Sequence, residues 1–103
     1  MYISNITHFL DDEGNIAQEM PKQAREMAGF LSLIIDAATL PKSQNQTPIK
    51  CLSKKCKGII QFERTGPDSI QWGCNGCSRY AGIISGWRGT KFDNTRIDYK
   101  LYK

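Results

Sequence analysis

Apolar residues recur every three or four positions between residues 22 and 40, which is the period of one face of an α-helix. This stripe consists of Ala24, Met27, Ala28, Leu31, Ile34, Ile35 and Ala38. The opposite side is polar or small, with Lys22, Glu26, Gly29, Ser32 and Asp36. Pro21 suits the first turn, because the amide that it lacks would have no partner there, and Pro41 stops the helix. The pattern predicts one amphipathic helix over residues 22–39.

Phe30, Leu33 and Ala37 make the apolar face of this helix broader than one small ribbon could cover. Two interpretations follow. The helix can pack on the chain's own strands as part of the core, or it can form the seam of a homodimer.

Stretches rich in β-forming residues lie on both sides of the helix. YISNITHFL (2–10) reads as a strand or extended segment and runs into a turn at DDEGN (11–15), where Gly14 can adopt a positive φ. PKSQNQTP (41–48) is polar, with proline at each end, and reads as a linker. Beyond it, GIIQFE (58–63) and SIQW (69–72) flank the turn sequence RTGPD, and GIISGW (82–87) follows. These runs predict a β-hairpin and a third strand.

Charge divides the chain into two unlike halves. The 103 residues carry a net charge of +4. Residues 1–49 hold three basic and six acidic side chains, a net charge of −3, whereas residues 50–103 hold eleven basic and four acidic ones, a net charge of +7. No apolar run is long enough to cross a bilayer, and the first residues lack the basic and apolar regions of a signal peptide. We therefore expect no membrane association and a reducing, cytoplasmic location.

All four cysteines lie in the basic half, as two close pairs. Four residues separate Cys51 from Cys56, two separate Cys74 from Cys77, and seventeen lie between the pairs. Each pair can supply two corners of a tetrahedron from a tight turn, and the predicted hairpin would bring the turns together. The spacing favours one structural Zn²⁺ held by four thiolates.

Two other chemistries suit paired cysteines. A redox dithiol needs its pair at the start of a helix, but CNGC (74–77) follows a strand, and Gly76 and Ser78 disfavour a helix there. Two disulfides would be unusual in a reducing compartment. Both alternatives are weaker than zinc.

Residues 49–87 combine two knuckles (tight turns that each carry one cysteine pair), a hairpin between them and a following strand. This order resembles a zinc ribbon. The first knuckle, CLSKKC (51–56), is two residues longer than usual, and Gly58 follows Cys56 by two positions instead of one. The stretch from Trp72 to Trp87 is also similar to that of small uncharacterised bacterial zinc-ribbon proteins, a likeness that implies no activity. The expected fold is α+β, with an N-terminal strand and turn, one amphipathic helix, and a three-stranded antiparallel zinc ribbon. We place the strand and helix in 1–40, the linker in 41–48, the ribbon in 49–92, and a basic tail or edge strand in 93–103.

The basic half suggests nucleic-acid binding as a function. The candidate contacts are Lys50, Lys54, Lys55, Lys57, Arg79, Arg88 and Lys91, which could neutralise phosphates while neighbouring aromatic rings stack on bases. The alternative is a protein-interaction or adaptor role, with homodimerisation through the 22–39 helix. A catalytic role is not expected, because His8 is the single histidine and no phosphate loop or nucleophile elbow occurs.

Overall fold

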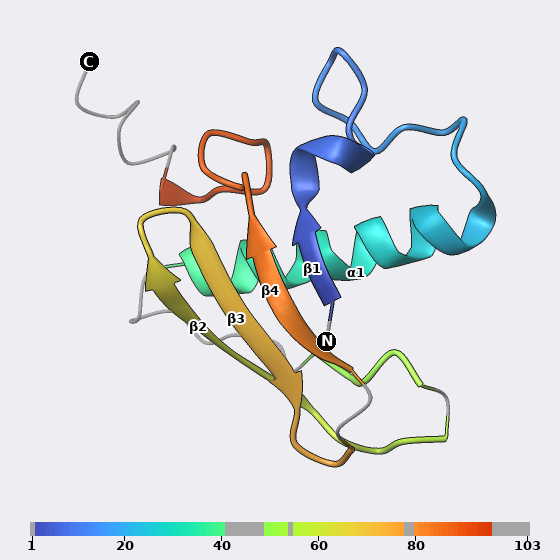
Figure 1. Cartoon of the computed structure of the whole chain (residues 1–103), viewed down its shortest axis with the longest axis vertical. Coiled ribbons are helices and arrows are strands. Elements are labelled where there is room, and N and C mark those ends of the chain that lie inside the picture. Colours follow the sequence, from blue (N-terminus) through green and yellow to red (C-terminus); the bar gives the residue numbers. More distant parts are fainter. Residues whose placement is uncertain (1, 41–48, 54, 78–79, 96–103) are drawn as a thin grey trace.

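The computed structural model describes residues 2–40, 49–53, 55–77 and 80–95 (Figure 1). Its elements are strand β1 (Tyr2–Asn5), the 3-10 helix η1 (Ile6–Phe9), helix α1 (Lys22–Thr39), and strands β2 (Ile60–Gly66), β3 (Ser69–Cys74) and β4 (Ala81–Ser85). The turn predicted at residues 11–15 forms, with Gly14 at a φ of 82°. The predicted linker (41–48) and residues 96–103 of the predicted tail lie outside the described residues.

The predicted amphipathic helix is confirmed. Helix α1 starts after Pro21 and ends before Leu40. Its apolar stripe is buried or half-buried, while the polar positions Lys22, Glu26 and Asp36 are exposed. A loop residue supports its C-terminal end, because the side-chain amide of Asn94 donates to the backbone oxygen and to the carboxylate of Asp36, both at 2.8 Å. One of the carbonyls that a helix end leaves without an intrahelical partner is thereby satisfied.

The expected α+β class is confirmed, but the predicted three-stranded antiparallel sheet is only part of the sheet that forms. The strands β2, β3 and β4 do pair antiparallel in that order, but β1 adds a fourth strand that pairs parallel with β4. The sheet order is β1-β4-β3-β2 (Figure 1). Gly82 permits this pairing, because a Cβ at that position would overlap the carbonyl oxygen of Tyr2. The sheet is therefore mixed, and the N-terminal strand belongs to it.

Helix α1 covers one face of this sheet, and the core lies between them (Figure 1). The core residues are Ile6, Phe30, Leu31, Ile34, Ile35, Ile60, Ile70, Trp72, Ile84 and Trp87. The ring of Phe30 meets that of Trp72 edge-on at 5.3 Å, a favourable geometry for aromatic pairs. Both tryptophans are thus core residues, at 3% and 0% exposure.

The apolar face of α1 is buried by the chain's own sheet, as the first of the two interpretations expected. Among the described residues of the helix, Leu33 is the large apolar side chain left exposed, at 57%. None of the described helices is long and apolar enough to span a membrane.

Candidate metal centre

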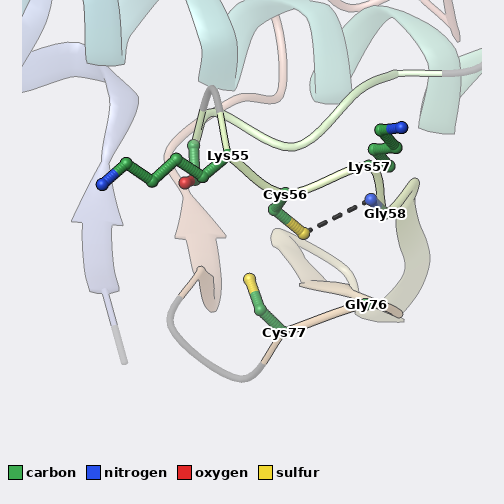
Figure 2. A pocket seen from close by; sticks show the side chains of 7 residues that line it. Lys55, Cys56, Lys57, Gly58, Gly76 and Cys77 are labelled. Atoms are coloured by element: carbon green, nitrogen blue, oxygen red, sulfur yellow. Dashed lines mark hydrogen bonds between the residues drawn. The ribbon is translucent and has the colours of Figure 1, made fainter.

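The first knuckle (51–56) is held against the start of β2 by backbone hydrogen bonds. The amide of Cys51 donates to the oxygen of Gly58 at 3.0 Å, and the amide of Cys56 donates to the oxygen of Ser53 at 3.2 Å. The amide of Gly58 points back to the Sγ atom of Cys56 at 3.3 Å (Figure 2). A thiolate that accepts an N–H in this way is stabilised in its charged form.

The second knuckle (74–77) repeats this arrangement. The amide of Gly76 donates to the Sγ atom of Cys74 at 3.3 Å, while the amide of Cys74 pairs with the oxygen of Tyr80 at 2.9 Å. Each half of the centre therefore contains a Cys-x-Gly unit in which the glycine amide points at the sulfur of the cysteine two residues earlier.

The two glycines also pack against each other. A Cβ on Gly58 would lie 2.5 Å from the Sγ atom of Cys74 and 2.7 Å from the amide nitrogen of Gly76. A Cβ on Gly76 would lie 3.0 Å from the Cα of Gly58. The knuckles can approach this closely because neither position carries a side chain.

Asn75 links the knuckles by two further hydrogen bonds. Its amide donates to the backbone oxygen of Ile59 at 3.1 Å, and its side-chain oxygen accepts the amide of Ile59 at 2.9 Å. Sequence reasoning missed Asn75, Gly58 and Gly76 as residues that build the site. The repeat of Cys-x-Gly at 56–58 and 74–76 was the signal that could have revealed the two glycines.

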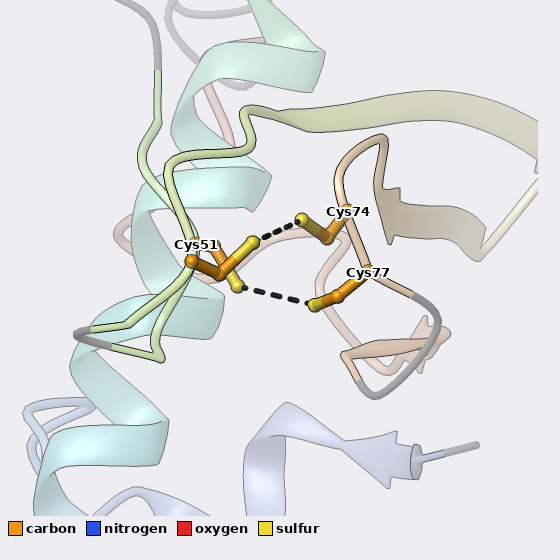
Figure 3. Close-up of side chains that lie close together, drawn as sticks. Cys51, Cys74 and Cys77 are labelled. Atoms are coloured by element: carbon orange, nitrogen blue, oxygen red, sulfur yellow. Dashed lines mark hydrogen bonds between the residues drawn. The ribbon is translucent and has the colours of Figure 1, made fainter.

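These contacts gather all four cysteine sulfurs into one cluster (Figure 3). The Sγ atoms lie within 4.8 Å of one another, with 3.8 Å between Cys51 and Cys77 and 3.5 Å between Cys56 and Cys74. A tetrahedron with metal–sulfur bonds of about 2.3 Å has edges of about 3.8 Å. The four cysteines could therefore hold one metal ion, as their spacing in the sequence predicted.

The thiols of Cys51, Cys56 and Cys74 differ in acidity. Burial raises the pKa of Cys51 to about 12, with the neighbouring sulfurs adding to the effect. Burial also acts to raise the pKa of Cys74, but the amide of Gly76 and the sulfur of Cys56 outweigh it and lower the pKa to about 7. At Cys56 the amide of Gly58 lowers the pKa, yet the Cys74 sulfur and burial together raise it above its usual value. A metal ion that binds here must displace the protons of the less acidic thiols.

The predicted nucleic-acid contacts that the structure describes lie in two groups, at opposite ends of the sheet. Lys55 and Lys57 are exposed and line a shallow hollow of about 570 Å³ beside Cys56 and Cys77; Figure 2 shows the two lysines extending in different directions from it. Lys50 is also exposed and pairs through its backbone with Ile59. These three lysines lie at the metal end of the sheet.

Arg88 and Lys91 lie at the other end. The Nε atom of Arg88 donates to the oxygen of Pro67 in the β2–β3 turn at 2.7 Å, and the Nζ atom of Lys91 donates to the side-chain oxygen of Asn15 at 2.9 Å. Strand β3 begins at Ser69 beside that turn and ends at Cys74, a distance of about 17 Å along the strand. Lys54 and Arg79, also predicted as contacts, lie outside the described residues.

Comparisons of the chain with family models, with curated proteins and with solved structures find no match. The likeness to a zinc ribbon therefore rests on the cluster of four cysteines and on the knuckles that carry it.

Proposed function

We propose that the four cysteines hold one structural zinc ion. The observation that carries this proposal is the cluster of four Sγ atoms within 4.8 Å of one another. Zinc commonly takes four thiolates in a closed tetrahedral site, which leaves no position for water or substrate. A zinc ion in this site would therefore stabilise the fold and would take no part in catalysis.

We further propose that the metal end of the protein binds nucleic acid through phosphate contacts. Support comes from Lys50, Lys55 and Lys57, which are exposed around the first knuckle, and from the chain's net charge of +4. Lysine ammonium groups bind phosphates as point charges, and the release of counterions drives such binding. Arg88 and Lys91 are not included in this surface, because they lie at the far end of the sheet.

The same lysines could instead serve the metal. A zinc ion with four thiolates carries a net charge of −2, which nearby ammonium groups would offset. The two roles differ in their experimental consequences, because charge reversal at the lysines would weaken zinc binding in one case and nucleic-acid binding in the other.

The test is a titration of the zinc-loaded protein against labelled single-stranded and double-stranded DNA and RNA, each at two salt concentrations. Lys55→Glu with Lys57→Glu should weaken binding and reduce the slope of log affinity against log salt by about 2, since each phosphate contact contributes about 0.9. Lys22→Glu with Arg25→Glu makes the same charge change on the exposed side of α1 and should leave the slope closer to that of the parent protein.

Equal losses in both double variants would show a response to net charge alone and would contradict the proposed surface. Zinc affinity is measured alongside. A loss of zinc binding without a loss of nucleic-acid binding in the zinc-saturated protein would assign the lysines to the metal.

The expected homodimer through the 22–39 helix has less support, because most of the apolar face of α1 packs against the sheet.

A further inference from the structure

Strand β2 lies at the edge of the sheet, and its backbone shows which residues face outward. The amide of Ile60 donates away from β3, to the oxygen of Ile49 at 2.8 Å, whereas both backbone groups of Ile59 are directed to Asn75. Hydrogen-bonding directions alternate along a strand in an antiparallel pair. Phe62 and Arg64 therefore direct their N–H and C=O groups outward, as Ile60 does.

Within the described part of the chain, no strand pairs with this outer edge beyond the bridge between Lys50 and Ile59. Exposed strand edges offer a row of unpaired donors and acceptors, to which another extended segment can add. Among the described residues, the backbone of β2 around residues 62–64 therefore has no strand partner on this side.

A groove of about 680 Å³ runs along the same edge. Its apolar part comes from Ala38 and Leu40 at the end of α1 and from Phe62. Its charged part consists of Arg64 and Arg88, against the single carboxylate of Glu63. The groove therefore combines an apolar floor, a free strand edge and a net positive charge.

Arg88 is held in place before any ligand arrives. Its Nε atom donates to the oxygen of Pro67 at 2.7 Å, and its guanidinium carbon lies 4.9 Å from the centre of the Trp87 ring. The carboxylate of Asp93, whose pKa Arg88 helps to lower, already accepts hydrogen bonds from Gly89 and Thr95. A guanidinium positioned in this way loses little freedom when it binds a carboxylate.

We infer that the outer edge of β2 binds an extended acidic segment of another protein, which adds as a strand beside residues 62–64. Phe62 and Arg64 are two positions apart and lie on the same face of the sheet. On that face, apolar side chains of the segment would contact Phe62 and Leu40, and carboxylates two positions further along the segment would pair with Arg64 and Arg88. Guanidinium–carboxylate pairs are strong because two parallel hydrogen bonds can form. The segment belongs to a separate protein, because this chain's own residues 41–48 and 96–103 carry four basic side chains and one acidic side chain.

The test uses a fluorescent peptide of eight residues, Val-Thr-Glu-Thr-Val-Thr-Glu-Thr, in which valine and glutamate alternate along one face of the extended strand and threonine occupies the other face. The zinc-loaded protein should bind it saturably, and the same peptide with glutamine in place of glutamate should bind at least about fivefold more weakly. A peptide N-methylated at every residue has no N–H left on either edge, so it cannot pair as a strand and should not bind. These comparisons need no protein variant.

Arg64→Glu should weaken binding of the glutamate peptide by about tenfold or more, because attraction is replaced by repulsion at an exposed position. Arg25→Glu, on the exposed side of α1, is the matched control and should stay within about twofold. In NMR spectra the amides of Phe62 and Arg64 should shift on titration, and those of Lys57 and Asn75 should not.

Three results would overturn the inference. These are no saturable binding of the glutamate peptide, equal binding of the glutamine or N-methylated peptide, or equal losses with Arg64→Glu and Arg25→Glu. A single-stranded oligonucleotide that shifts these amides when the peptide does not would assign the groove to nucleic acid instead.

Discussion

Gly58→Ala tests whether the metal centre depends on the close approach of its two knuckles. The new Cβ would lie 2.5 Å from the Sγ atom of Cys74, whereas ordinary contacts begin near 3.4 Å. The sulfur or the backbone of Gly76 would therefore have to move by about 1 Å, well beyond the roughly 0.2 Å tolerance of a metal–ligand bond.

The expected cost follows from this overlap. Overpacking at a tightly packed position costs about 1–3 kcal/mol, and this penalty applies to the metal-bound form, in which the sulfurs cannot separate. Zinc affinity should fall by about 5-fold to 150-fold. Competition with a chromophoric chelator measures the affinity, and a thermal melt of the zinc-loaded protein provides an independent readout.

Two further glycines make the experiment a graded series. A Cβ on Gly76 would have its nearest contact at 3.0 Å, and one on Gly73 would meet only the Cβ of Ala81, at 3.5 Å. The loss of affinity should decrease from Gly58→Ala to Gly76→Ala to Gly73→Ala. If Gly58→Ala binds zinc within about twofold of Gly73→Ala, the reasoning on knuckle contact is refuted.

Four other predictions concern the metal, the link between the knuckles, a buried acid and the core. Cys74→Ser should lose both zinc and the fold of the C-terminal half, because structural zinc supplies on the order of 10 kcal/mol to small domains. Removing zinc from the parent protein with a chelator should have the same effect. Circular dichroism and metal analysis check both results, and full zinc retention in Cys74→Ser would contradict the site. Asn75→Ala should lower the unfolding free energy by about 0.5–1.5 kcal/mol. Asn75→Asp should lower it less, because the aspartate keeps an acceptor for the Ile59 amide. Similar losses in both variants would count against a role for that hydrogen bond. Burial raises the pKa of Asp93, but hydrogen bonds from Thr95 and Gly89 outweigh it and lower the pKa below its usual value. The ionised carboxylate therefore stabilises the fold above about pH 4, and this stabilisation is lost as the pH falls through the folded-state pKa. The difference in unfolding free energy between the parent protein and Asp93→Asn should shrink on acidification, and a constant difference would refute the assignment. Trp87→Ala should lower the unfolding free energy, measured by denaturant titration, by about 3–5 kcal/mol. Trp87→Phe should lower it much less, since the indole N–H has no acceptor among the described residues and no hydrogen bond is lost. Equal losses in the two variants would contradict this prediction.

The helix and the cysteine cluster were both predictable, for related reasons. Apolar residues recur with the period of a helix from Ala24 to Ala38, and this period predicts an apolar helix face whatever that face packs against. The cysteine spacing places two sulfurs in each of two tight turns, and the hairpin between them brings the turns together. Each inference depends mainly on residues that are close in sequence.

The fourth strand could not be predicted in the same way. Residues 2–5 were expected to be extended, but their partner, residues 82–85, lies about eighty positions away, and nothing in either stretch specifies a parallel pairing. Gly82 is the residue that permits the contact, and its role is evident only once Tyr2 lies beside it.

The distribution of basic residues shows the same limit. Lys55 and Arg88 belong to one basic half of the sequence, yet β3 and β4 carry Arg88 to the end of the sheet opposite the metal centre. Local sequence thus determined the helix, the hairpin and the cluster of four sulfurs, because periodicity and tight-turn geometry act over a few residues. Tertiary structure alone decided the parallel edge strand, the contact between Gly58 and Gly76, and the separation of the basic side chains, because each depends on distances between segments that no local pattern encodes.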